Sequence, residues 1–202
     1  MIDILTPLGL LLLLIGMSAK LLRLTAINKK PHLHKLMILL VVTMAFIPFA
    51  DYSLFNVLYG VVGFFSLPTL ALLTLFVLRQ FGFVAAELNQ LTKTLLATNA
   101  VLIGLVLYPS AIGFIDLDLY ALGYSYPISG LFAVLILMAL WFKQWLLALI
   151  YILAWLGWLI QLNCSPNGFD YLLDFWLVCW GLIWLISQLI SKFKGAQLWR
   201  KN

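Results

Sequence analysis

Long apolar stretches separated by short polar segments run through the whole chain. Seven such stretches can be marked, at roughly 4–22, 36–50, 54–78, 94–115, 128–142, 145–162 and 175–190. A helix needs about 20 mostly apolar residues to cross the hydrocarbon core of a bilayer, where it satisfies its own backbone polar groups. The pattern therefore predicts an all-α, polytopic transmembrane helical bundle of about seven spans.

The charged residues divide by sign between the two ends of these spans. All twelve Lys and Arg residues fall on one side together with Glu87, and the other six carboxylates fall on the opposite side. Cytoplasmic loops of membrane proteins carry the excess of Lys and Arg. We therefore expect the N-terminus outside and the C-terminus in the cytoplasm, in a multi-pass protein of a bacterial inner (cytoplasmic) membrane.

The composition excludes most other classes of protein. Of the 202 residues, 65% are hydrophobic and 9% are charged, whereas about 25% of the residues of a soluble domain are charged. The longest connecting segments have about a dozen residues, so residues 1–202 are expected to form a single integral membrane domain. The net charge of +5 lies at span ends beside anionic lipid head groups, so the expected partner is the lipid bilayer and not nucleic acid.

Two connecting segments on the basic side have chemistry of their own. Residues 29–35, Lys-Lys-Pro-His-Leu-His-Lys, are expected to form a solvated loop, since two histidines without a nearby cysteine or carboxylate make a poor metal site. Trp141 and Trp145 flank Lys143 in a tight hairpin, as an interfacial aromatic belt requires. Spans five and six should therefore be antiparallel neighbours.

The outer side of this topology concentrates the unusual residues. Two loops there carry most of the carboxylates together with tyrosines and asparagines. The candidate ligand- or partner-binding residues are Asp51, Asp116, Asp118, Tyr120, Tyr124, Asn163, Asn167, Asp170, Asp174 and Trp176.

Two interpretations of these carboxylates stay open. If span seven begins near Asp170, then Asp170 and Asp174 lie on one helical face, and their repulsion favours a cation, a shared proton or solvent between them. A ligand or partner site would add Asp116 or Asp118, and a divalent cation is the one cofactor that it would take. Alternatively, carboxylates at this boundary cap helix N-termini and face solvent. No other metal site or cofactor is predicted.

Polar and aromatic residues within the spans also allow more than one role. Trp176, Trp180 and Trp184 recur every four residues and so form one stripe, which would pack against a neighbouring helix or stack on a ring-shaped ligand. Asn99 is costly in lipid, so we expect it to face another helix and make an interhelical hydrogen bond.

Several activities are excluded by what the outer face and the spans lack. The expected topology places no histidine outside, which excludes a Ser-His-Asp site there. The span interiors hold only neutral polar residues, which argues against a proton-driven pump. The seventh span, 175–190, has no lysine to form a retinal Schiff base.

Three functions from different classes stay open. The favoured one is a non-enzymatic accessory or partner-binding protein in cell-envelope work, with another envelope membrane protein as its partner at the acidic outer face. The second is a facilitative transporter of a neutral or cationic small solute along a path lined by Trp155, Trp158, Trp180 and Asn99. The third is an outer-face enzyme acting on a lipid-linked sugar, with an acid, base or metal-ligand role for Asp116, Asp118, Asp170 and Asp174.

Overall fold

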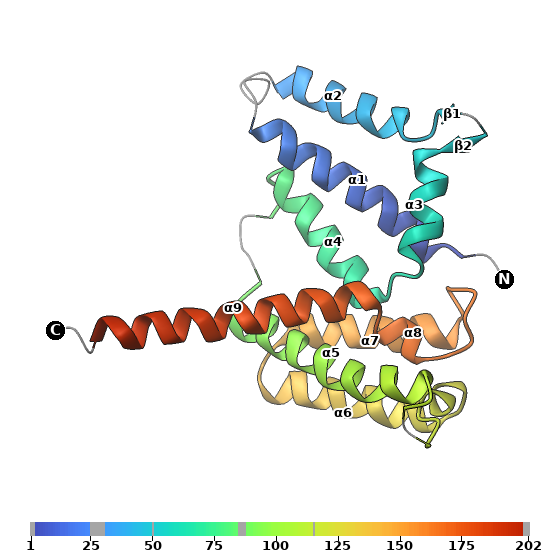
Figure 1. Ribbon diagram of the computed structural model, residues 1–202, viewed down its shortest axis with the longest axis vertical. Coiled ribbons are helices and arrows are strands. Elements are labelled where there is room, and N and C mark those ends of the chain that lie inside the picture. The colour runs from blue at the N-terminus through green and yellow to red at the C-terminus, as the bar shows by residue number, and fades with distance from the viewer. Residues whose placement is uncertain (1–2, 25–30, 50, 85–87, 115, 200–202) are drawn as a thin grey trace.

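The computed structural model describes residues 3–24, 31–49, 51–84, 88–114 and 116–199, with the side chains of 31, 49 and 194–199 left aside. These residues form an all-helical fold apart from one short hairpin (Figure 1). The elements are α1 (Leu5–Arg23), α2 (Pro31–Met44), β1 (Pro48–Phe49), β2 (Tyr52–Ser53), α3 (Leu54–Val62), α4 (Leu67–Gln80), α5 (Gln90–Ala111), the 3-10 helix η2 (Tyr120–Tyr124), α6 (Pro127–Trp141), α7 (Trp145–Leu159), α8 (Phe169–Leu172) and α9 (Phe175–Trp199).

The helices form two groups that meet along α4 (Figure 1). In the first group α1 packs against both α2 and α4, and in the second α5 packs against α9 and α6 against α7. The α1–α4 contact is close, because a Cβ on Gly16 would lie 2.5 Å from the ring of Phe76. Between the groups, α4 contacts α7 and α8 but touches α9 only slightly.

Three of the described helices are long and apolar enough to cross a membrane. They are Leu5–Arg23, Gln90–Ala111 and Phe175–Phe193, with mean hydropathies of 1.9, 1.6 and 1.4. The other long apolar helices have 13 to 15 residues: His32–Met44, Leu67–Gln80, Pro127–Trp141 and Trp145–Leu159. At 1.5 Å per residue each of these is about 20 Å long, which is shorter than the typical hydrocarbon core of about 30 Å. The fold is that of a membrane protein.

The prediction of one continuous helix over 54–78 is wrong. The helix breaks between α3 and α4, where Gly63 takes a φ of 71° and Ser66 begins a new helix by accepting a hydrogen bond from the amide of Thr69. Pro68 sits in the first turn of α4, where its missing N–H costs nothing. A positive φ at a glycine followed by a new N-cap is a standard helix stop and restart.

The N-terminal connectors also differ from the prediction. Helix α2 begins at Pro31, so His32 and His34 lie in its first turn and not in a solvated loop, whereas Lys29 and Lys30 fall outside the described residues. A proline at the first helical position is already in helical geometry, which explains the early start. Helix α2 then ends at Met44, before the β1–β2 hairpin, whose strands pair Pro48 with Ser53.

Two predicted interhelical contacts are confirmed. The amide of Asn99 on α5 donates a 2.9 Å hydrogen bond to the hydroxyl of Tyr151 on α7. Helices α6 and α7 pack as an antiparallel pair across the turn at Lys143. Both contacts lie in the main core, which is built around the fully buried Phe132 and Leu147.

Candidate functional site

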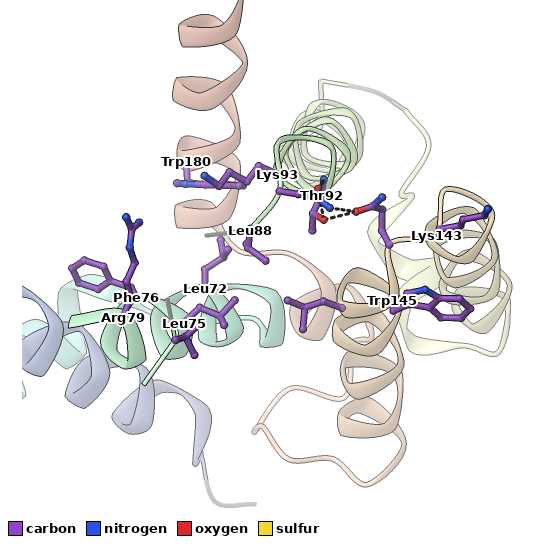
Figure 2. A pocket seen from close by; sticks show the side chains of 14 residues that line it. Leu72, Leu75, Phe76, Arg79, Leu88, Thr92, Lys93, Lys143, Trp145 and Trp180 are labelled. Atoms are coloured by element: carbon purple, nitrogen blue, oxygen red, sulfur yellow. Dashed lines mark hydrogen bonds between the residues drawn. The ribbon is translucent and has the colours of Figure 1, made fainter. Parts of the chain in front are cut away.

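A cavity of about 630 Å³ opens where α4 ends and where α5 and α7 begin (Figure 2). Trp180 on α9 closes one side, while Phe76 and Leu72 of α4 line another. The cavity therefore gathers residues from four helices that are far apart in the sequence. Its volume lies in the range of small-molecule sites.

Three cationic side chains line this cavity. Arg79 comes from the last turn of α4, Lys93 from the first turns of α5, and Lys143 from the α6–α7 turn. The Nζ of Lys93 lies 4.9 Å from the ring centroid of Trp184, which places the ammonium over an aromatic face. Glu87, in the connector between α4 and α5, lies outside the described residues.

Lys143 occupies a backbone position that usually belongs to glycine. Its φ is 55°, and the turn closes with hydrogen bonds from the amide of Gln144 to the carbonyl of Ala139 (2.8 Å) and from the amide of Lys143 to that of Leu140 (2.9 Å). This is the arrangement in which glycine ends a helix, and a side chain there costs roughly 1 kcal/mol. The chain therefore places a cation in the cavity wall at a small cost in stability.

The wall between α5 and α7 is held by a polar cluster. The side chain of Asn89 caps α5 by accepting from the amide of Thr92 at 2.6 Å. The Oε1 of Gln144 accepts a hydrogen bond from the hydroxyl of Thr92 at 2.6 Å and another from the side-chain amide of Asn89 at 2.8 Å. Gln144 is 8% exposed, so this cluster fixes the α6–α7 turn against the start of α5.

Two helix N-termini meet this cavity. Helices α5 and α7 both begin at its wall, and no side chain caps the first turn of α7. The N-terminus of a helix carries partial positive charge and backbone N–H donors, which favour anions. The side-chain cations and the positive ends of these two helices therefore both favour an anion in the cavity.

An apolar groove of about 600 Å³ continues from the basic cavity. It runs between α1, α4 and α9 and shares Leu72, Phe76 and Trp180 with the cavity. The rest of its lining is formed by Leu13, Lys20, Val62, Phe65, Thr69, Leu73, Trp176 and Leu177. The groove and the cavity are adjacent, and we refer to them together as the recess.

Asp174 is buried and works as a structural cap. It is 7% exposed, and its Oδ1 accepts from the amide of Leu177 at 2.7 Å, which begins α9. Its Oδ2 accepts from the amide and the hydroxyl of Ser66, both at 2.7 Å. The predicted arrangement of Asp170 and Asp174 on one helical face is wrong, because α8 ends at Leu172 and the chain is extended before α9.

The two loops that the sequence predicts to be outer loops converge on Asp170 and Asn167. The hydroxyl of Tyr120 donates to Asp170 at 2.7 Å, and the amide of Asn167 donates to the carbonyl of Tyr120 at 2.9 Å. The backbone amide of Gly168 donates to the carbonyl of Gly123 at 2.8 Å. Burial and then the hydrogen bond to Asp170 raise the pKa of Tyr120 above its ordinary value. These contacts tie the loops together through structural hydrogen bonds.

Two further aspartates of the candidate set are exposed, and one of them makes a local turn contact. Asp118 accepts from the amide of Ala121 at 3.1 Å, and Asp116 faces solvent. Asp51 lies in the β1–β2 turn with a φ of 75°, a conformation that aspartate tolerates. Among the residues that the structure describes, no group of three His, Cys, Asp or Glu side chains could hold a metal ion.

The remaining candidates have structural contacts. Asn163 is fully buried, and its Oδ1 accepts from the next backbone amide at 2.7 Å. The indole of Trp176 donates to the carbonyl of Val62 at 3.0 Å, which joins α9 to the end of α3. Tyr124 packs edge-on against Tyr120, with 5.9 Å between the ring centroids.

The predicted transport path does not form one cavity. The space beside Asn99 and Tyr151 measures about 10 Å³, which is about the minimum for one water molecule. Trp155 donates to Ser129 at 3.3 Å, and Trp158 donates to the carbonyl of Pro166 at 2.9 Å. Of the four residues predicted to line the path, Trp180 is the one that lines the recess.

No known protein-family model matches the chain, and no curated protein or solved structure shows significant similarity to it. Chemistry and geometry therefore carry the functional argument. The basic cavity is the site that the sequence did not single out, because Arg79, Lys93 and Lys143 enter the sequence pattern only as topological charges. The one sequence feature that these three residues share is that each lies at the beginning or the end of an apolar stretch.

Proposed function

We propose that this chain is a non-enzymatic, multi-pass inner-membrane protein that binds a phosphate-type anion in the basic cavity on its cytoplasmic side. The observation that carries this proposal is the cavity of about 630 Å³, whose lining includes Arg79, Lys93 and Lys143 and the first residues of α5 and α7. Charge-assisted hydrogen bonds from Arg and Lys are the strongest that side chains offer to phosphate.

The orientation in this proposal follows from the charges and the chain path. The long helices run in alternating directions (Figure 1). If each of them crosses the membrane once, with α3 counted together with α4, the protein has seven passes, and the cavity with its cations would lie on the side of the C-terminus, as the positive-inside rule favours. The shorter helices cross if the bilayer thins locally, which costs only fractions of a kcal/mol per Å.

A binding role has more support than catalysis at the outer face. The carboxylate of Asp174 already accepts hydrogen bonds from Ser66 and Leu177, and the carboxylate of Asp170 accepts one from Tyr120. A general acid or base needs access to a substrate proton. The outer carboxylates thus serve the fold, and the open, charged recess lies at the other side.

Isothermal titration with glycerol 3-phosphate, a head group without a chain, tests the proposal on the purified protein in neutral detergent. Arg79→Gln, Lys93→Gln and Lys143→Gly should each weaken binding roughly tenfold, since about 1.4 kcal/mol corresponds to a factor of ten. Lys192→Gln, an exposed cation beyond the cavity on α9, is the matched control and should bind like the unaltered chain. Equal affinity for all four variants would overturn the proposal.

Lys143→Gly separates binding from folding. Glycine relieves the positive φ, so this variant should unfold at an equal or higher temperature while it binds more weakly. Introduced cysteines test the orientation: a thiol at Asp118 should react with an impermeant reagent from outside, and a thiol at Lys143 should not. The reverse pattern would invert the topology.

A further inference from the structure

The apolar groove raises a question that the basic cavity alone does not answer, namely whether the bound anion is free or attached to a hydrocarbon chain. We infer that it is a membrane lipid phosphate, with its head group in the basic cavity and a chain in the groove between α1, α4 and α9. This inference rests on the proposed function and names the class of its ligand.

Continuity between the two spaces is the first argument. Leu72, Phe76 and Trp180 line both of them, so the charged part and the apolar part are adjacent and share these three side chains. A ligand that fills both must be charged at one end and apolar along the rest. That is the chemistry of a lipid phosphate and not of a free anion.

The lining of the groove fits a chain. Nine of its eleven lining residues are aliphatic or aromatic, and the two exceptions are Lys20 and Thr69. Lys20 lies in the last turn of α1. Near it, Arg23 on α1 donates to the carbonyl of Gln80 at the end of α4, so this part of the groove lies at the head-group end. The two polar side chains thus leave the middle of the groove to apolar contacts.

The groove is long enough for part of an acyl chain. Along α4, the groove begins near Thr69 and the cavity reaches Arg79, ten residues further on. Ten helical residues span about 15 Å. A chain that starts at the cavity would therefore extend toward the hydrogen bond from Trp176 to Val62.

The packing of the helices explains why the groove is open. Helix α4 is closely packed on α1, and α9 on α5, but α4 and α9 make slight contact with each other. Near one end of their seam Trp176 bonds to Val62 of α3, while Trp180 stacks on Trp184 at 6.3 Å and also lines the groove. A hydrocarbon chain fills such a seam without needing any hydrogen bond.

The inference is tested with dioleoyl phosphatidic acid that carries a diazirine in one acyl chain, in nanodiscs of neutral lipid. Photolysis followed by peptide mapping should place the main adducts on groove residues such as Leu13, Leu73 and Trp176. Arg79→Gln with Lys93→Gln should lower the yield at those positions at least tenfold, and Lys192→Gln should not. Adducts that spread evenly over the outer surfaces of α2 and α6, as for annular lipid, would overturn the inference.

Two ligands distinguish failure of the inference from failure of the proposed function. Phosphatidic acid should bind at least a hundredfold more tightly than glycerol 3-phosphate, and Leu73→Trp, which fills the groove, should remove most of that difference. If both ligands bind equally, the ligand is a soluble anion, and the inference fails while the proposed function stands. If neither binds, the proposed function fails as well. Leu13→Trp fills the groove from α1 instead, and serves where Leu73→Trp does not fold.

Discussion

The carboxylate of Asp174 holds Ser66, 108 residues earlier in the chain, through two hydrogen bonds of 2.7 Å. The same carboxylate caps α9 by accepting from the amide of Leu177. One buried anion therefore lies at the N-termini of both α4 and α9, where both helix dipoles favour it. The break between α3 and α4 depends on this contact.

Replacing this carboxylate should destabilise the fold. Asp174→Asn keeps the shape but offers one acceptor atom to three donors, so we expect a loss of roughly 2–4 kcal/mol in the free energy of unfolding. Thermal unfolding in detergent, followed by tryptophan fluorescence, measures the change. Asp116→Asn at an exposed site is the control and should stay within about 0.5 kcal/mol. Equal stability of the two variants would contradict the structural role of Asp174.

The junction of the outer loops should tolerate no side chain at Gly123. A Cβ there would lie 1.9 Å from the Oδ1 of Asn167, so Gly123→Ala should destabilise the protein by roughly 1–3 kcal/mol. Gly130 on α6 has nothing within 4 Å, so Gly130→Ala should be neutral or stabilising by about 0.5–1 kcal/mol. The same unfolding assay compares them, and a harmless Gly123→Ala would show that the loops do not meet.

The interhelical bond between Asn99 and Tyr151 should be measurable as a coupling energy. A double-mutant cycle with Asn99→Leu and Tyr151→Phe isolates the pair. Hydrogen bonds between membrane helices average about 0.6 kcal/mol and reach about 1.7 kcal/mol, and the buried hydroxyl of Tyr151 points to the upper half of that range. Additive effects of the two substitutions would show that the pair is not coupled.

The stability of the outer loops should fall at high pH. Because the pKa of Tyr120 in the folded state lies above its ordinary value, which is about 10, its contribution is complete below about pH 10 and decreases as the pH rises toward the folded-state value. At neutral pH Tyr120→Phe should cost about 1–2 kcal/mol through the lost bond to Asp170. The gap between this variant and the unaltered chain should narrow above about pH 10.

A control variant tests whether the loss of stability at high pH comes from Tyr120. Tyr126 is 86% exposed, and Tyr126→Phe should track the unaltered chain at every pH. A gap for Tyr120→Phe that stays constant from pH 7 to pH 11 would mean that the phenol of Tyr120 does not titrate differently in the folded state.

The parts of the fold that depend on local apolar pattern follow from the sequence. Helices α1, α6 and α7 begin within one residue of the predicted positions, because an apolar run bounded by charge or proline fixes both ends of a helix. The break at Gly63 could not be predicted in the same way. Residues 63–66 are mostly apolar, and Asp174, the partner of Ser66, lies far along the chain.

The candidate sites, like the fold, could be predicted from the sequence only in part. The sequence places Asp170 and Asp174 together at the outer boundary, but whether they share a helical face depends on the extended residue Leu173, which has no distinctive local signal. The basic cavity depends on tertiary packing that brings Arg79 of α4 and Lys143 of the α6–α7 turn into the lining of one space. Charge predicts the side of the membrane on which such residues should lie, and packing determines which of them line one cavity.

The contact between Asp174 and Ser66 also has a consequence for the order in which the helices assemble. During synthesis α4 emerges long before Asp174, so the first helical group must insert with Ser66 lacking its partner. We expect a chain truncated after Gly168 to be cut by protease at residues 63–66, where the full chain resists. A chain that lacks the last helix would therefore keep an unprotected site between α3 and α4.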